Sequence, residues 1–417
     1  MIKLAYSTNG ITNVDFFKAV QEIKKANYQG VEISFQKGQF DPYGLSDEEL
    51  DKIRWFFEKN SIEPVGISTG TAFFLSNEYP HEPSIISLDE LGRRERISLI
   101  KRGIEIAKRL NVPIVTFQTG HLRSEHLAHN VPPRQLLIQG IQELLKNIGD
   151  VCLVIEPEPG MFIESLEDGV ELVKEINSPS FFLHLDIGHA FCTQKNYVQD
   201  IADAVPYTKY IHLADIRDGY NLQFMCFNNF QDVLDMSVSP NFSGVLLYLK
   251  DMDVYLFKDN KSCFCFFEDS LSNAQKEKIN ILSQKLGKNI FVSFVKKEKL
   301  DNINVERDIK LEIKAYLESI PGIERDVLKN AEDIIGFLRS SSDTVNGQII
   351  RQAVCNTTQG KVHYHEFPGK GGIDFNAVFK ALQDRNYQGY VTVELYNHVD
   401  VWEEVIPESY RYLKNCM

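Results

Sequence analysis

Short apolar runs alternate with amphipathic segments through the first half of the chain, and this alternation constrains the fold more than any other feature. The apolar runs, each of strand length, cover residues 3–8, 30–34, 64–70, 114–120, 151–156, 181–189 and 210–215. Between them, spacings of three and four residues between apolar positions predict helices over 13–27, 46–60, 87–110, 133–147, 165–176 and 198–204. Seven strands that alternate with helices predict parallel βαβ units with right-handed crossovers.

The eighth unit is separated from the first seven by a segment of different character. Apolar pieces at 244–250, 253–257, 263–267 and 290–294, with helical patterns near 272–286, 305–319 and 324–339, predict a small α+β module over residues 220–359. The earlier rhythm then resumes with a helix at 374–382, a strand at 390–396 and a terminal helix at 406–415.

Without this module, residues 1–219 and 360–417 together are close in length to the ~250 residues typical of a (β/α)8 TIM barrel. The prediction is therefore an α/β protein, a TIM barrel with the module inserted between strand seven and helix seven. An open doubly wound sheet is disfavoured, because no glycine-rich phosphate turn follows the first strand.

Composition and charge narrow the class of partner. Hydrophobic residues make up 43% of the 417 residues and charged residues 25%, as in soluble globular proteins. The net charge of -13 argues against a nucleic-acid partner. Neither a signal-peptide pattern nor an apolar run of membrane-spanning length is found, so we expect a cytoplasmic protein with no membrane partner. The seven scattered cysteines are expected to be free thiols.

Polar side chains stand at the ends of the last four predicted barrel strands. The apolar run at 151–155 leads into Glu156, where Pro157 ends the ladder. A buried carboxylate is costly unless something neutralises it. Asp186, His212 and Glu394 hold matching positions on the following strands, and strand ends meet at one mouth of a TIM barrel. Oxygen and imidazole ligands together predict a site for one divalent cation such as Mn²⁺, Mg²⁺, Co²⁺ or Zn²⁺, with salt-bridged structural carboxylates as the alternative.

Five motifs in order carry a resemblance to a known superfamily. They are Ile155-Glu-Pro-Glu-Pro-Gly160, Leu185-Asp-Ile-Gly-His189, Ile211-His-Leu-Ala-Asp215, His363-Tyr-His-Glu-Phe-Pro-Gly-Lys-Gly371 and Val393-Glu394. They resemble the successive motifs of the xylose-isomerase-like TIM barrels, which include ketose 3-epimerases, hydroxypyruvate isomerase, inosose dehydratase and endonuclease IV. The resemblance spans both barrel segments and leaves out the insertion.

The resemblance implies a role for each matched residue. Glu156, Asp186, His212 and Glu394 would be the metal ligands, and Glu156 and Glu394 would also exchange protons with the substrate as in the epimerases. The resemblance further implies that His189, Arg217 and His365 contact the substrate, although the spacing of Arg217 from His212 departs from the family pattern.

The expected chemistry is proton abstraction beside a metal-chelated carbonyl of a small sugar-like metabolite. Isomerisation, epimerisation, dehydration and β-elimination from a 3-keto glycoside all begin with that step, so the sequence leaves them open. An endonuclease IV-like hydrolase is a weaker alternative, because Gln118 stands where the nuclease needs a histidine ligand. A barrel without catalytic activity is a further alternative. The module at 220–359 is expected either to cap the mouth or to form a homodimer contact.

Overall fold

The computed structural model describes residues 2–76, 81–122, 126, 132–216 and 365–417, together with the backbone of five strands between residues 245 and 353. By its internal contacts the chain divides into two compact units. One unit comprises Met1–Arg217 and His363–Met417, and the other comprises Asp218–Val362.

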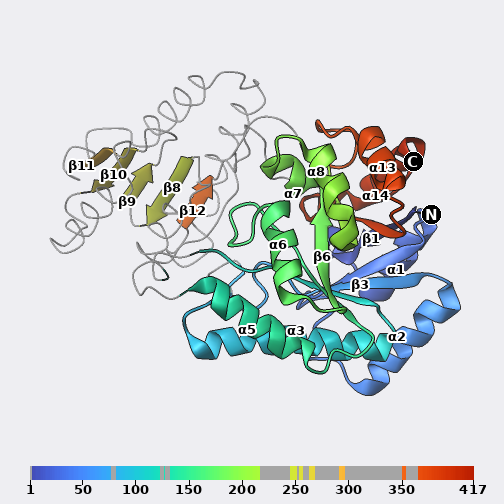
Figure 1. Ribbon diagram of the computed structural model, residues 1–417. Coiled ribbons are helices and arrows are strands. Elements are labelled where there is room, and N and C mark those ends of the chain that lie inside the picture. The colour runs from blue at the N-terminus through green and yellow to red at the C-terminus, as the bar shows by residue number, and fades with distance from the viewer. Residues whose placement is uncertain are drawn as a thin grey trace. The chain divides into compact units, whose positions relative to one another are not determined.

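Eight parallel strands close into a barrel in the first unit (Figure 1). They are β1 (Ile2–Ser7), β2 (Gly30–Ser34), β3 (Glu63–Ser68), β4 (Ile114–Phe117), β5 (Cys152–Ile155), β6 (Phe181–Asp186), β7 (Thr208–Leu213) and β13 (Gly389–Val393). Their order around the barrel is β1-β13-β7-β6-β5-β4-β3-β2. The last strand in the chain therefore pairs with the first, and this closure confirms the predicted (β/α)8 barrel.

Helices follow the strands and lie outside the barrel (Figure 1). They are α1 (Phe16–Lys25), α2 (Asp47–Asn60), α3 (Glu90–Leu110), α5 (Pro133–Leu145), α6 (Leu166–Ile176), α7 (Ile187–Thr193), α8 (Tyr197–Ala204), α13 (Phe375–Asp384) and α14 (Trp402–Cys416). Short 3-10 turns cover η1 (Thr8–Ile11), η2 (Val205–Tyr207) and η5 (Tyr396–Val401). None of the helices in the described ranges is long and apolar enough to cross a membrane.

Polar side chains begin several of these helices at the residues that the sequence indicates. At α2, Ser46 accepts a bond from the backbone N–H of Glu49, and the Glu49 carboxylate accepts one from the Ser46 N–H, which together form a capping box. Ser165 caps α6 through the N–H of Asp168. These bonds satisfy N–H groups that the first helical turn leaves without a partner.

Apolar side chains pack on both faces of the barrel wall. The outward-facing residues of the strands and the buried faces of the helices form one continuous core. A separate small cluster, Ala5, Val65, Ile114, Val154 and Tyr210, comes from the alternate positions of the strands and fills the interior of the barrel. Polar residues occupy the next inward-facing positions toward the carboxyl ends of the strands, so the site lies above an apolar floor.

Strand β6 ends earlier than the sequence indicates, which corrects the predicted strand over residues 181–189. The Asp186 Oδ1 atom accepts a hydrogen bond of 2.7 Å from the backbone N–H of His189, and helix α7 begins at Ile187. Asp186 is therefore both the last residue of a strand and the N-cap of a helix. This position gives its carboxylate a fixed orientation at the barrel mouth.

Asp215 joins the two chain segments that flank residues 217–364. Its backbone N–H and C=O both pair with Glu366, at 2.7 and 2.9 Å. Its carboxylate accepts four backbone N–H bonds, from Ile216, Gly369, Gly371 and Ile373, at 2.8–3.2 Å. The glycine-rich turn after the insertion thus directs three of its N–H groups to a carboxylate of the same chain.

The second unit is described only by its strands. β8 (Val245–Lys250) lies between β9 (Asp253–Leu256) and β12 (Ile350–Ala353) in an antiparallel sheet, and β10 (Cys263–Phe267) pairs in parallel with β11 (Phe291–Val295). Four of these strands match the apolar pieces predicted from the sequence to within a residue. The helices predicted near 272–286, 305–319 and 324–339 lie outside the described residues.

Candidate metal centre

Four neighbouring strands bring the four predicted ligands to the carboxyl end of the barrel. β13, β7, β6 and β5 are adjacent in the barrel order. Glu394 and Glu156 directly follow β13 and β5, while His212 and Asp186 lie within β7 and β6 and are paired in register. The side chains of Glu156 and His212 are 2% and 1% exposed, and that of Glu394 is 13% exposed. Buried charge is therefore concentrated at one end of the barrel.

The Nδ1 atom of His212 lies at the centre of this group. It is 3.5 Å from Oε1 of Glu156 and 3.5 Å from Oε2 of Glu394. Both distances are at the outer limit of a hydrogen bond, and Nδ1 is buried without a hydrogen-bond partner among the described residues. Two carboxylates thus face one imidazole nitrogen across a small gap.

A second set of ligand-type side chains adjoins the first. Asp186, His189 and His365 are all buried, and one ligand atom from each lies within 4.8 Å of the others. Nδ1 of His189 lies 2.9 Å from the carbonyl oxygen of Pro157, and Nδ1 of His365 lies 2.9 Å from that of Glu394. These contacts with the chain's own carbonyls orient both rings at the mouth. Of the three residues predicted to contact substrate, His189 and His365 therefore lie together, and Arg217 lies outside the described residues.

Two side-chain amides, each just beyond the end of another barrel strand, donate hydrogen bonds to the glutamates. The Gln118 side-chain amide, just beyond β4, donates to Oε2 of Glu156 at 2.5 Å. The Asn9 amide, in η1, donates to Oε1 of Glu394 at 2.7 Å. Each bond leaves the other carboxylate oxygen facing His212. Amide donors of this kind fix the direction of a carboxylate without neutralising its charge.

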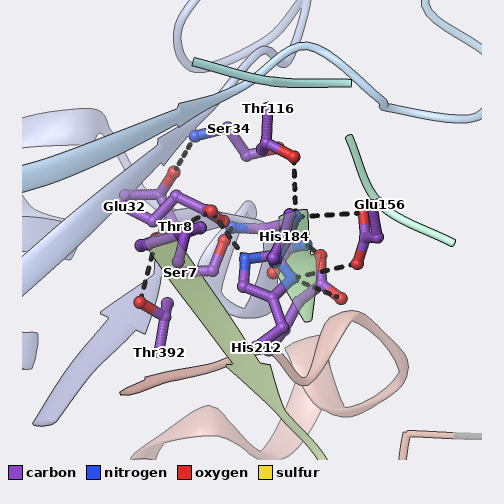
Figure 2. Close-up of polar contacts among 12 residues, drawn as sticks. Ser7, Thr8, Glu32, Ser34, Thr116, Glu156, His184, His212 and Thr392 are labelled. Carbon is purple, nitrogen blue, oxygen red and sulfur yellow. Dashed lines mark hydrogen bonds and ion pairs between the residues drawn. The ribbon is translucent and has the colours of Figure 1, made fainter. Parts of the chain in front are cut away.

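His184 lies two residues before Asp186 on β6 and therefore faces the same side, one layer deeper in the barrel. Its ring is fully buried and packs edge-on against His212, with ring centroids 4.1 Å apart. Its Nδ1 atom is 2.6 Å from the Thr116 hydroxyl and 3.5 Å from the Glu156 carboxylate (Figure 2). The ring thus belongs to the packed interior of the barrel and also borders the site.

The electrostatics of the site reflect burial opposed by neighbouring charge. Burial raises the pKa of Glu156, and His212 and His189 only partly oppose it. Burial acts on Glu394 in the same direction, but the charge and hydrogen bond of His212, together with His365 and His189, outweigh it and lower the pKa of Glu394 to about 2. The pKa of His212 is raised well above its ordinary value, since Glu32 and Glu394 outweigh the effect of burial. The centre therefore favours positive charge between its carboxylates.

The residues present fit a divalent cation. Oδ2 of Asp186 and Nδ1 of His212 are both buried and have no hydrogen-bond partner within the described part of the chain. Such atoms are costly to bury unless a cation or a proton is shared with them. Carboxylate oxygens with one imidazole nitrogen are the donor set that Mn²⁺, Mg²⁺, Co²⁺ and Zn²⁺ accept.

Some site residues were not found from the sequence. Glu32 on β2 lies 2.6 Å from His212 Nε2. The sequence signal for it is a carboxylate in the middle of the short strand Gly30–Ser34, all of which is buried. Asn9 gave no signal, because it follows a strand in an ordinary polar turn. Glu158, whose role the sequence left open, is half-buried, and burial raises its pKa to about 8. His363 lies outside the described residues.

Comparison with known proteins agrees with the barrel fold. A family model described as "Xylose isomerase-like TIM barrel" matches residues 20–244 and 312–416. An inosose isomerase from Halalkalibacterium halodurans is 24% identical over 222 residues, which are 52% of this chain and 73% of that protein.

Two solved structures show the same fold at low identity. One is the IolI protein with a binding zinc atom, with a TM-score of 0.52 and 16% identity over 100% of this chain and 96% of that chain. The other is a D-tagatose 3-epimerase-like protein, with a TM-score of 0.52 and 13% identity over 99% of each chain.

Proposed function

Because the chain belongs to the xylose isomerase-like TIM barrel family, we propose that it is a divalent-metal-dependent isomerase or epimerase. Its substrate would be a sugar or sugar-like metabolite with a carbonyl beside a hydroxyl group. The observation that carries the proposal is the convergence of Glu156 and Glu394 on a buried His212 Nδ1 atom that has no partner among the described residues. The similarity to an inosose isomerase supports the same class of reaction.

We propose that Glu156, Asp186, His212 and Glu394 hold the cation. Bound there, a divalent cation would act as a Lewis acid on the carbonyl of the substrate. The cation would also neutralise the carboxylates, whose burial in this site otherwise carries a cost. The IolI structure, which has the same fold and a bound zinc atom, supports a divalent metal in this chain.

The proton transfers are assigned to the two glutamates. The low pKa of Glu394, about 2, keeps its carboxylate ionised at neutral pH and able to accept a proton. Glu156 faces the same Nδ1 atom of His212 as Glu394, and burial raises its pKa, which suits a group that returns a proton. In this scheme one carboxylate removes the proton beside the carbonyl and the other delivers a proton to the same or the neighbouring carbon. His189 and His365 would contact the substrate hydroxyls.

A small-molecule substrate is preferred to nucleic acid. The Gln118 amide occupies Oε2 of Glu156, and an amide nitrogen is not a metal ligand, which disfavours a nuclease-like cluster of three ions. The net charge of -13 also disfavours binding to a phosphate backbone.

Metal analysis followed by solvent-deuterium exchange tests the proposal. We expect one divalent ion per chain, and loss of that ion in Glu156→Gln and Asp186→Asn, with the exposed Asp384→Asn as the matched control. The loaded protein should exchange deuterium into at least one member of a panel of keto-sugars, keto-inositols and keto-glycosides. Full metal content in both site variants would refute the ligand assignment.

The products separate the related reactions. Recovery of an isomer or epimer supports the proposed function, whereas release of water or of an aglycone would assign the same proton abstraction to a dehydratase or lyase. Three bound ions with cleavage of abasic duplex DNA would overturn the proposal. A metal-free protein that exchanges no deuterium would instead support a non-catalytic barrel.

A further inference from the structure

Glu32 reaches across the barrel interior to the imidazole of His212. β2 and β7 are separated by β1 and β13 in the barrel order, so the contact is not between paired strands. Oε2 of Glu32 lies 2.6 Å from Nε2 of His212, and both side chains are at most 1% exposed. Figure 2 shows Glu32 on one side of the His212 ring and Glu156 on the other.

A second donor fixes the Glu32 carboxylate. The Tyr210 hydroxyl lies 2.9 Å from the same Oε2 atom, and the Thr392 hydroxyl lies 2.9 Å from the Tyr210 oxygen. A carboxylate only accepts, so the tyrosine donates its proton to Glu32 and accepts one from Thr392. This chain of bonds helps to hold Oε2 of Glu32 against His212.

The fold leaves room for this arrangement at one glycine. Gly66 on β3 faces the Tyr210 ring, and a Cβ atom there would lie 3.0 Å from the tyrosine oxygen. That separation is closer than ordinary van der Waals contact. A side chain at position 66 would therefore press on the Tyr210 ring, which would have to shift by a few tenths of an ångström.

An acceptor at Nε2 determines which nitrogen of His212 faces the mouth. Glu32 can only accept, so Nε2 carries a hydrogen and the ring directs Nδ1 toward Glu156 and Glu394. A histidine ligand whose second nitrogen donates to a carboxylate is held in one tautomer and one orientation.

We propose that Glu32 is a positioning residue that keeps His212 Nε2 protonated and presents Nδ1 as the ligand to a divalent cation. The inference rests on the proposed metal-dependent function and adds to it a residue outside the ligand set. Loss of such a partner typically lowers metal affinity about 10- to 100-fold. The amide of Glu32→Gln can either accept from Nε2 or donate to it, so the substitution removes the preference for one tautomer.

Cobalt titration of the full-length protein, followed by visible absorption and calorimetry, tests the proposal. Glu32→Gln should bind Co²⁺ at least about ten-fold more weakly than the wild type, with a changed ligand-field spectrum. Asp384→Asn is the control, because that carboxylate pairs with Lys380 on the exposed surface and its substitution makes the same acid-to-amide change without touching Glu32 or His212. The affinity of this variant should stay within about three-fold of the wild type, because the imidazole of His212 keeps its bond to Glu32.

The outcomes separate this inference from the proposed function. Equal cobalt affinity in Glu32→Gln and the wild type would overturn the inference and leave the proposed function standing. Wild-type protein that binds no cobalt would overturn both. Nitrogen-15 NMR of zinc-loaded wild-type protein, with His212 assigned by substitution, decides the matter if Glu32→Gln does not fold. Zinc on Nδ1 with a slowly exchanging Nε2 proton supports the inference, and zinc on Nε2 overturns it.

Discussion

Replacement of Asp215 by asparagine should destabilise the barrel strongly. The Asp215 carboxylate is 1% exposed and accepts four backbone N–H bonds, two on each oxygen. Asparagine has the same shape but one acceptor oxygen, so its NH₂ group would face two N–H donors. Two buried donors would then lack an acceptor.

The magnitude follows from those two donors. A buried donor without a partner costs about 1–3 kcal/mol, so the pair should cost about 4 kcal/mol. A domain of this kind is stable by only about 5–15 kcal/mol, so the loss is a large fraction of the total. At about 2–4 °C per kcal/mol, the midpoint of thermal unfolding should fall by roughly 10 °C.

Tryptophan fluorescence isolates the barrel in this measurement. Both tryptophans of the chain, Trp55 and Trp402, belong to the barrel unit, so their signal reports its unfolding and not that of the second unit. Asp384→Asn provides the control, because that carboxylate pairs with Lys380 on the exposed surface and should contribute less than about 1 kcal/mol. Equal midpoints for Asp215→Asn and Asp384→Asn would refute the argument that Asp215 joins the segments flanking the insertion.

Two further predictions concern buried polar groups of the barrel. Thr116→Val keeps the shape of the side chain but removes the hydroxyl that bonds Nδ1 of His184, and urea unfolding should show a loss of about 1–3 kcal/mol. A loss below roughly 0.5 kcal/mol, as at surface positions, would show that the bond contributes little. Burial raises the pKa of Glu164 to about 7, so the folded protein favours the protonated carboxyl group. The contribution of this group to the free energy of unfolding should therefore be highest at low pH and should fall as the pH rises through about 7. Glu164→Gln should therefore match the wild type near pH 5 and unfold at a higher urea concentration at pH 8, and a difference that does not change with pH would contradict this reasoning.

The fold could be predicted because it depends on local patterns. Strand lengths and helical periodicity are properties of neighbouring residues, and eight such units with short connections leave few topologies. The clearest error, the extension of β6 to His189, has a local cause. The apolar run continues past Asp186, but the Asp186 carboxylate binds the His189 N–H and starts a helix there. A pattern of apolar residues alone does not distinguish that helix from more strand.

The location of the four candidate ligands at one mouth of the barrel could also be predicted, because the end of a strand can be recognised in the sequence. Parallel strands bring all their carboxyl ends to one mouth, so a polar residue that ends an apolar run is placed there without knowledge of register. The glycine-rich turn shows the limit of such reasoning. Its composition suggests a phosphate site, yet its N–H groups bind Asp215, a residue 154 positions away from Gly369.

The contacts that orient the ligands depend on register and closure, which no local pattern contains. Glu32 meets His212 across 180 positions of sequence, from a strand that is not its neighbour in the barrel. The two meet because β13 closes the barrel against β1, and because strand register pairs Glu32 with Ser7 of β1 and His212 with Thr392 of β13. A shift of one residue in β7 would turn His212 out of the barrel and Ile211 into it. Barrel closure therefore determines which nitrogen of His212 faces the mouth. That a histidine lies near the end of this strand can be seen in the sequence alone.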